Sequence, residues 1–329
     1  MRKILVTGGV GFIGFYITKI LSEDDRNIIH VVDDLSKSGL DDQFKNLLHK
    51  SNVKFFQNDL TDLGTYNRID ANYDQIYHLA AIIGVKKVTN NPVLTIKTNT
   101  LSTIYLLEFI SKMPKHPKLV FASSSENYAG TINSFGGPIP TPEKVPLCIQ
   151  DIFNPRWTYA ATKILGEIAC IQYSMKYGFD TTIVRYHNVY GPRMGTQHVI
   201  PEFVLRLKQN PRVLNMFGGN QKRSFCYCTD AAKMTINLMN CVKSNNLVVN
   251  IGNPESFCIS YIAKEISRIM GTHPKIKENG APEGSVEERI PDLSLIQGLG
   301  AFVAEVPFSE GLKKTSEWYN SNDYLNLEQ

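Results

Sequence analysis

The chain has 329 residues and a mass of 37.0 kDa, enough for one large domain or two unequal lobes. Its composition, 43% hydrophobic and 20% charged, excludes a disordered chain, a collagen-like repeat and a coiled-coil rod. The net charge of +4 is spread along the chain without a long basic run, so nucleic acid is not expected as a partner.

The N-terminal segment MRKILVTGGVGFIG is unlike a signal peptide, because a threonine and four glycines interrupt its apolar run. No stretch approaches the ~20 apolar residues that a membrane-spanning helix needs, so no membrane partner is expected. The six cysteines lack the paired spacing of a zinc site, so we expect no metal: Cys148, Cys170, Cys226, Cys228, Cys241 and Cys258. Reduced cysteines predict a cytoplasmic protein.

Short apolar runs alternate with helical patterns over the first 120 residues. We expect strands at Lys3–Thr7, Ile28–Val32, Val53–Gln57, Gln75–Ala80 and Lys118–Ala122, and helices at Phe12–Leu21 and Leu94–Met113. Runs this short and this apolar are typical of strands that are covered on both faces. The alternation predicts an α/β fold with a doubly wound parallel sheet of the Rossmann type.

The second half of the chain has a looser pattern. Residues 123–154 are rich in serine, glycine and proline and are expected to be loop, followed by a helix at Thr158–Tyr177 and a strand at Thr181–Tyr186. Shorter elements follow: helices near Pro201–Gln209, Thr229–Val242, Ser260–Met270 and Phe308–Asn320, and a strand at Leu247–Ile251. We therefore expect a Rossmann domain over residues 1–190, to which residues 225–252 or so return, and a smaller C-terminal α/β substrate-binding lobe over 191–329.

A glycine-rich turn separates the first predicted strand from the first helix. Gly8, Gly11 and Gly14 permit a tight turn and let the backbone approach a pyrophosphate at the helix N-terminus. Asp33 ends the second strand 19 residues after Gly14, where a carboxylate can bind a ribose diol. With Asp34 it would repel a 2′-phosphate, so the predicted cofactor is NAD rather than NADP.

Tyr159 and Lys163 are four residues apart in a predicted helix, and therefore share one of its faces. A nearby ammonium stabilises a phenolate and lowers the pKa of the tyrosine. Tyr159 could then act as a base near neutral pH.

Motifs along nearly the whole chain resemble those of the extended short-chain dehydrogenases/reductases, in the branch of NAD-dependent nucleotide-sugar epimerases, dehydratases and decarboxylases. They are TGGVGFIG, VVDDLS, NDL at 58–60, HLAA at 78–81, ASSSENY at 122–128, YAATK at 159–163, HNVYGP at 187–192, RSFCYCTD at 223–230 and RIPD at 289–292. The resemblance implies that the substrate is a nucleotide-diphosphate sugar.

The resemblance also assigns roles to residues. Tyr159 would take the proton of the sugar 4-hydroxyl while a hydride passes to NAD, with Lys163 on the nicotinamide ribose and Ser124 as the catalytic serine. The implied cofactor-binding residues are Gly8, Gly11, Phe12, Ile13, Gly14, Asp33, Asp34, Ser38, Asp59, Leu60, Leu79, Ala80, Ala81, Asn99, Tyr159, Lys163 and Tyr186. The implied substrate-binding residues are Ser124, Asn188, Val199, Arg223 and Arg289.

Glu126 decides which reaction is expected. A carboxylate two residues after the catalytic serine could remove the proton at carbon 5 of a 4-keto sugar, so a 4,6-dehydratase is the first expectation. Many dehydratases of this type have an aspartate where Ser125 stands here. A 4-epimerase, which needs little beyond Tyr159, Lys163 and Ser124, is the second expectation, and a uronate decarboxylase, whose carboxylate could pair with Arg223, is the third. A reductase and a non-catalytic NAD-binding homologue are the remaining alternatives.

Relatives form homodimers by packing two long helices of each subunit into a four-helix bundle. The matching segments here are Leu94–Met113 and Thr158–Tyr177, so a homodimer is expected. The alternative is that their apolar faces only cover the sheet of the same subunit.

Overall fold

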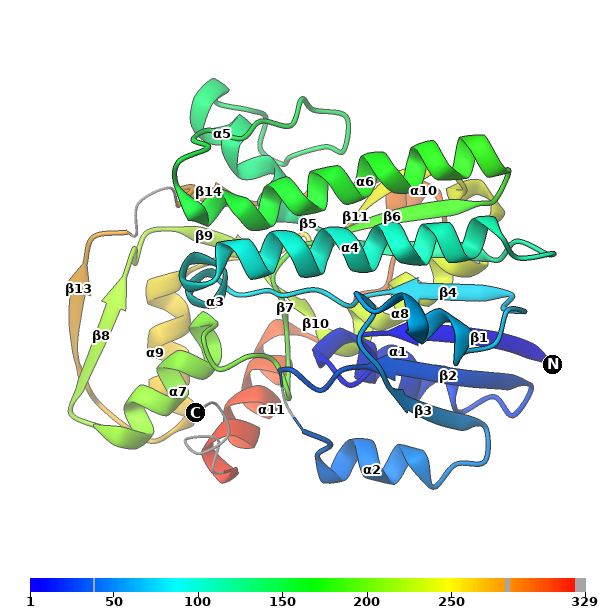
Figure 1. Cartoon of the computed structure of the whole chain (residues 1–329). Helices are drawn as coiled ribbons and strands as arrows, with labels where there is room; N and C mark the ends of the chain where they lie inside the picture. The colour runs from blue at the N-terminus through cyan, green and yellow to red at the C-terminus, as the bar shows by residue number, and fades with distance from the viewer. Residues whose placement is uncertain (38, 282–284, 323–329) are drawn as a thin grey trace.

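The computed structural model describes residues 1–37, 39–281 and 285–322, and a seven-stranded parallel sheet forms its centre (Figure 1). In spatial order the strands are β11 (Leu247–Ile251), β6 (Thr181–Tyr186), β5 (Lys118–Ser124), β4 (Gln75–His78), β1 (Arg2–Thr7), β2 (Asn27–Asp33) and β3 (Val53–Gln57). This order and direction confirm the predicted doubly wound sheet of the Rossmann type.

Helices cover both faces of the sheet. Successive side chains of a strand point to opposite faces, so Ile4 and Val6 belong to one apolar cluster and Leu5 belongs to another. The first cluster lies under α1 (Phe12–Leu21) and α8 (Cys228–Asn240), and the second under α4 (Pro92–Ser111) and α6 (Thr158–Tyr177), which run side by side in Figure 1. Burial of both faces explains the near-continuous apolar runs of these strands.

Shorter helices connect the strands and build the C-terminal part. They are α2 (Asp42–Leu48), α3 (Val85–Asn90), α5 (Ala129–Phe135), α7 (Val199–Gln209), α9 (Ile259–Ile269), α10 (Ser294–Gly298) and α11 (Phe308–Ser321), with 3-10 turns η1 (Leu63–Asn67), η2 (Ser125–Tyr128), η3 (Pro155–Trp157) and η4 (Val242–Ser244). The segment 123–154, expected to be loop, therefore contains η2 and α5. Within the described ranges, no helix is both long enough and apolar enough to cross a membrane.

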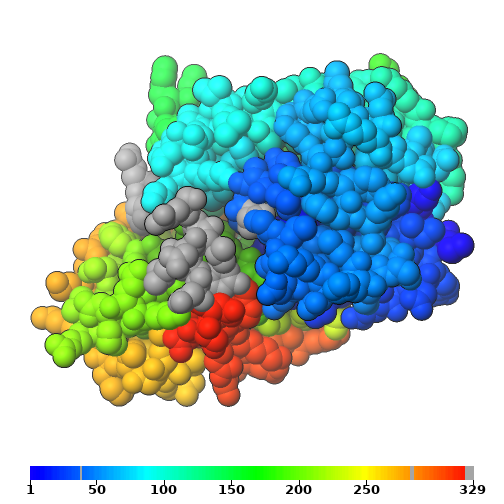
Figure 2. Space-filling view, turned by 60° about the horizontal axis from the view of Figure 1, so that its bottom comes forward, coloured from blue at the N-terminus to red at the C-terminus, as the bar shows by residue number. Residues whose placement is uncertain are grey.

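Three small sheets lie beyond the carboxyl ends of the main strands. They are β10 (Cys226–Tyr227) with β7 (Val189–Tyr190); β12 (Ser256–Cys258), β9 (Lys222–Ser224) and β14 (Glu288–Arg289); and β13 (Lys275–Asn279) with β8 (Val213–Phe217). Figure 2 shows the N-terminal and C-terminal parts of the chain as two adjacent masses. The expected boundary at residue 190 stays a prediction, although β11 does return to the main sheet.

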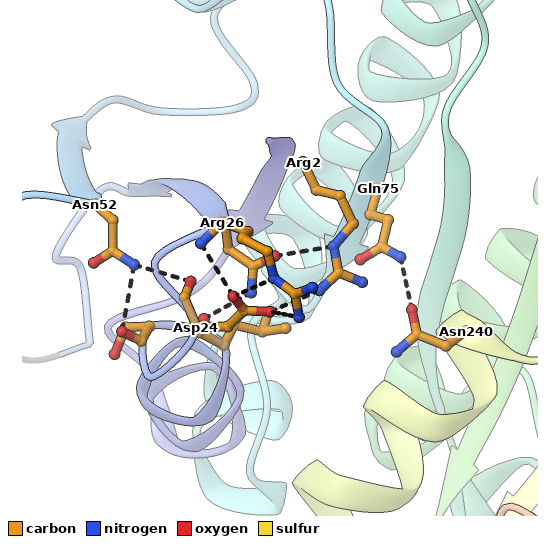
Figure 3. Close-up of polar contacts among 9 residues, drawn as sticks. Arg2, Asp24, Arg26, Asn52, Gln75 and Asn240 are labelled. Carbon is orange, nitrogen blue, oxygen red and sulfur yellow. Dashed lines mark hydrogen bonds and ion pairs between the residues drawn. The ribbon is translucent and has the colours of Figure 1, made fainter.

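Polar contacts fix the opposite, amino-terminal edge of the sheet (Figure 3). Arg2 at the start of β1 donates to Asn27 Oδ1 over 3.0 Å and lies 3.4 Å from Asp24. A hydrogen bond from Arg26 to Asp24 lowers the pKa of that carboxyl to about 2. Asn52 Nδ2 also donates to the Asp24 carbonyl, over 3.4 Å. These contacts hold the turn between α1 and β2 on the side of the sheet away from the glycine loop.

Close packing of α6 on β5 gives a stability prediction. A Cβ at Gly166 would lie 2.4 Å from Phe121 Cζ, and the Phe121 side chain is buried in the core. Gly166→Ala should therefore lower the free energy of unfolding by about 1–3 kcal/mol, measured by urea denaturation. Gly298→Ala is the matched control, because no atom lies within 4 Å of a Cβ there. Equal stability of the two variants would contradict this packing.

Candidate active site

Two cavities meet at the carboxyl ends of the central strands, where ligands bind in open α/β sheets. The glycine-loop cavity, of about 240 Å³, is lined by Gly8, Gly11 and Gly14 among others. The arginine cavity, of about 630 Å³, is lined by four arginines: Arg156, Arg206, Arg223 and Arg289. The two cavities share the side chains of Phe12, Ile13, Ile83, Ser124, Tyr159 and Tyr186. A ligand in one cavity can therefore meet a ligand in the other at Ser124 and Tyr159.

The glycine loop is a cradle that side chains would fill. Gly8 has φ +68°, and a Cβ there would lie 2.6 Å from Ala80 N. A Cβ at Gly14 would lie 2.3 Å from Gly8 O. Gly11 is the N-cap of α1, so the loop ends at the positive end of a helix dipole. These positions let a diphosphate approach the backbone closely.

Asp33 ties the glycine loop to the end of β2. Its Oδ2 accepts a hydrogen bond from Val10 N over 3.1 Å, and its Oδ1 accepts one from Leu35 N over 3.0 Å. Burial raises the pKa of the Asp33 carboxyl, which these backbone donors oppose. Asp34 lines the same cavity and accepts a hydrogen bond from Ser36 N over 2.9 Å.

Most residues expected to bind the cofactor line the glycine-loop cavity: Gly8, Gly11, Phe12, Ile13, Gly14, Asp33, Asp34, Asp59, Leu60, Leu79, Ala80, Ala81, Tyr159, Lys163 and Tyr186. Asn99 does not line it. Asn99 is buried in α4, where its amide accepts from Ile82 N over 2.7 Å and donates to Ile82 O over 3.1 Å. It therefore fixes the chain just after β4. Ser38 lies outside the described residues.

Tyr159 and Lys163 project from one face of α6 toward the end of β5. Lys163 is buried, and its Nζ donates to Ala122 O over 2.6 Å and lies 5.9 Å from the centre of the Tyr159 ring. Ser124 and Tyr159 both line the two cavities, and the Ser124 hydroxyl acts to lower the pKa of the Tyr159 phenol. The fold therefore brings Ser124, Tyr159 and Lys163 together in one cavity, as expected from the sequence.

Their ionisation differs from the expectation. We expected Lys163 to lower the pKa of Tyr159, but in the protein alone that pKa is raised. Burial is the cause, and it outweighs the effect of the Ser124 hydroxyl. Burial also lowers the pKa of Lys163 to about 8, which weakens its charge near neutral pH.

Glu126 and Arg289 form an ion pair in the arginine cavity, with Oε1 and Nη1 2.5 Å apart. Burial alone would raise the pKa of Glu126, but the charge and hydrogen bond of Arg289, with the charges of Arg156 and Arg223, hold it below its usual value. Burial and repulsion from Arg289 lower the pKa of Arg223 to about 9. Cations packed this closely favour an anionic ligand.

The residues expected to bind substrate, Ser124, Asn188, Val199, Arg223 and Arg289, all line the arginine cavity. The guanidinium of Arg223 donates to three backbone carbonyls, and two of them hold it against residues 286–287. Arg156 is a cavity residue that the sequence analysis missed. Its position in NPRW, three residues before Tyr159, was the available signal. Lys37 and Lys87, in the glycine-loop cavity, were missed because they belong to no recognisable motif.

A comparison with known proteins identifies this arrangement. The sequence profile of the NAD dependent epimerase/dehydratase family matches residues 4–252. The chain belongs to that family. It is 31% identical to a UDP-N-acetyl-alpha-D-glucosaminuronate decarboxylase of Bacillus cytotoxicus, over 97% of this chain and 98% of the relative. It is also 31% identical to a putative UDP-glucose 4-epimerase of Methanocaldococcus jannaschii, over 97% and 99%.

Solved structures agree with this membership. A UDP-glucuronic acid 4-epimerase from Bacillus cereus, solved with UDP-glucuronic acid and NAD, superposes with a TM-score of 0.84 at 26% identity, covering 97% of this chain and 99% of that one. A dTDP-glucose 4,6-dehydratase from Bacillus anthracis, at 22% identity and a TM-score of 0.82 over 98% of each chain, shares the fold. The resemblance stated from the motifs is confirmed. This family member is an NAD-dependent enzyme of nucleotide-sugar metabolism.

NAD is the cofactor, as expected, and the glycine loop fits it. Open backbone at Gly8, Gly11 and Gly14 suits a diphosphate, and the carboxylates of Asp33 and Asp34 suit ribose hydroxyls but would repel a 2′-phosphate.

The clash at Gly14 gives a binding prediction. Gly14→Ala should weaken NAD binding by about 100-fold or more, measured by titration calorimetry, because the new methyl would push on Gly8 O inside the diphosphate cradle. Gly39→Ala is the matched control, since a Cβ there meets no atom within 4 Å. Unchanged NAD affinity in Gly14→Ala would show that the cofactor does not use this loop.

Proposed function

We propose that this family member decarboxylates a UDP-linked hexuronate through a 4-keto intermediate. The ion pair of Glu126 with Arg289 carries the proposal, because it lies in the arginine cavity beside Ser124 and Tyr159. A sugar carboxylate on carbon 6 would find a guanidinium there. Relatives named as decarboxylases support the assignment, among them UDP-glucuronic acid decarboxylase 1 of Xenopus tropicalis, 28% identical over 97% of this chain.

Oxidation at carbon 4 comes first. Tyr159, beside Ser124 where the two cavities meet, receives the proton of the 4-hydroxyl, and Lys163 orients the cofactor from the buried face of α6. Bound NAD supplies the acceptor for the hydride of carbon 4 and can later return it. The positive charge that accompanies the oxidised cofactor would oppose the burial that raises the pKa of Tyr159.

Carbon dioxide is lost from the resulting β-keto acid. The bond between carbons 5 and 6 breaks, its electron pair moves toward the 4-keto oxygen, and a proton replaces carbon dioxide at carbon 5. Arg289 orients the carboxylate, and Glu126 relays the proton. A substrate carboxylate that shares Arg289 would weaken its pairing with Glu126 and raise the pKa of Glu126, which suits a proton donor.

The 4,6-dehydratase that the sequence analysis placed first has less support. Elimination of water needs an acid beside the base, and the residue before Glu126 is Ser125, a buried hydroxyl. The dehydratase among the compared structures, at 22% identity, shares the fold alone. From the sequence, Arg223 was the arginine that could pair with the carboxylate of a uronate. We favour Arg289 for that role, because Arg223 already donates hydrogen bonds to backbone carbonyls.

A 4-epimerase is the second candidate. Tyr159, Lys163 and Ser124 suffice for reversible oxidation at carbon 4, and a UDP-glucuronate 4-epimerase of Thermodesulfobacterium geofontis is 31% identical over 98% of this chain. In that reaction Arg289 would hold the carboxylate of the uronate, and no carbon dioxide would be lost.

Mass spectrometry separates these reactions. Purified protein with NAD is incubated with UDP-glucuronate, UDP-N-acetylglucosaminuronate, UDP-glucose and dTDP-glucose, each alone. We expect a product lighter by one carbon dioxide from a uronate. An isomer of unchanged mass but new chromatographic retention time would assign the epimerase, and loss of water would assign the dehydratase. Either outcome would overturn the decarboxylase.

Variants then locate the chemistry. Arg289→Met should lower kcat for a uronate by about 100-fold while NAD binding is kept. Arg268→Met, at an exposed ion pair on α9, is the matched control and should leave kcat unchanged. Tyr159→Phe should remove most turnover of every substrate. Full activity of Arg289→Met on a uronate would contradict its role.

We also propose that the protein is a homodimer. Apolar side chains are exposed on the neighbouring helices α4 and α6: Val93, Leu94, Ile96, Leu165, Ile168 and Met175. Sedimentation should show about twice the 37.0 kDa of one chain, because burial of this surface stabilises association. Ile168→Glu should give single chains, whereas Val242→Glu, also exposed but in η4, should not. A single-chain species of the wild type would contradict the dimer.

A cytoplasmic location remains part of the proposal. All six cysteines are free thiols, which suits a reducing compartment.

A further inference from the structure

Glu167 is a buried carboxylate that none of the chemistry above uses. It lies on α6, four residues after Lys163 and eight after Tyr159, on the same face of the helix. Its side chain is 5% exposed and forms an ion pair with Arg185 of β6, with Oε2 and Nη2 2.6 Å apart. A buried ion pair is weak evidence of stability, since desolvation opposes the attraction. The side chains that Glu167 contacts therefore indicate its role.

Two of those groups flank residues 124–126, the segment that contains Ser124 and Glu126 and is called the catalytic turn below. Ser123 Oγ donates to Glu167 Oε1 over 2.5 Å, and Asn127 Nδ2 donates to the same oxygen over 2.8 Å. The segment between them contains Ser124 and Glu126. Asn127 Nδ2 also donates to Ser123 Oγ over 3.1 Å, which closes the turn upon itself. One carboxylate oxygen therefore holds both ends of the turn that carries Ser124 and Glu126.

The same network reaches the segment that carries Arg289. Arg185 Nη1 donates to Tyr128 Oη, which in turn donates to Asn250 Oδ1, each over 2.8 Å. Asn250 Nδ2 donates to Asp292 O over 3.1 Å. Asp292 is three residues after Arg289. Hydrogen bonds thus connect the helix of Tyr159, the turn of Glu126 and the segment that directly follows Arg289.

We infer that Glu167 is a positioning residue that sets the catalytic turn against α6, so that Ser124 and Glu126 meet the substrate held at Tyr159. The buried carboxylate of Glu167 suits this role, because hydrogen bonds to a carboxylate out of contact with water are strong and directional. The inference deepens the proposed function and rests on Ser124, Glu126 and Tyr159 performing it. It does not depend on which reaction follows oxidation at carbon 4.

Two serines offer a matched test. Ser123 and Ser174 are each 3% exposed, and each donates a hydrogen bond of 2.5 Å, Ser123 to Glu167 and Ser174 to Phe179 O at the far end of α6. Each serine is replaced by alanine in the full-length protein. Ser123→Ala should lower kcat by about 10-fold with KM and NAD affinity within about twofold of wild type, because the turn loses its position. Ser174→Ala should keep the wild-type kcat at a similar loss of Tm.

Glu167→Gln should lower kcat by about 100-fold. Adding Ser123→Ala to it should cost little more, because both act through the same carboxylate. Additive losses in the double variant would contradict a shared route, and equal kcat values for Ser123→Ala and Ser174→Ala would overturn the inference.

Amide hydrogen exchange gives a readout without substrate. Exchange in a peptide covering residues 122–130 should be faster in Ser123→Ala and Glu167→Gln, and unchanged in Ser174→Ala. The kcat values are measured on whichever nucleotide sugar the wild type converts. If that sugar is not a uronate, the decarboxylase fails while the positioning role is still tested. Unchanged exchange in Ser123→Ala would overturn the positioning role whatever the reaction.

Discussion

Burial of both faces of the parallel sheet is the constraint on which the rest of this protein depends. Successive strands of this sheet are joined by crossover connections, most of which carry an α-helix, and these helices cover both faces while every strand runs in the same direction. All carboxyl ends then lie along one edge. The glycine loop after β1, Asp33 at the end of β2 and Ser124 at the end of β5 meet there although they are far apart in sequence. The site is thus a consequence of how the core is covered.

Buried and partly buried charges are concentrated at that edge. Lys163 is held by a backbone carbonyl, and Glu126 and Arg289 are held by each other. Removing such groups from water costs free energy, and the apolar packing of the sheet and its helices offsets that cost. Burial lowers the pKa of Lys163 and raises that of Tyr159, so burial favours the neutral form of each side chain. A site of this kind responds strongly to the charge of the ligand it receives.

Sequence patterns predicted the main sheet well because its strands have a strong signal. The run Lys3–Thr7 is buried on both sides, so it is apolar without alternation, and the structure places β1 there. The small strands gave no such signal. β13 (Lys275–Asn279) is mostly charged or polar and largely exposed, so only its pairing with β8 defines it. Likewise α2 and α3, of seven and six residues, are too short for a helical period to emerge.

The sequence by itself determined the fold and the cofactor, and it named the residues that we propose to act at carbon 4. Short-range spacing carries that information: three glycines in one turn, and a tyrosine and a lysine one helical turn apart. Only the tertiary structure decided what surrounds those residues. Arg289 pairs with Glu126 across 163 positions of the chain, and Glu167 gathers Ser123, Asn127 and Arg185 from three other segments. Contacts at such separations leave no periodic pattern, because they arise when the sheet brings distant strand ends together.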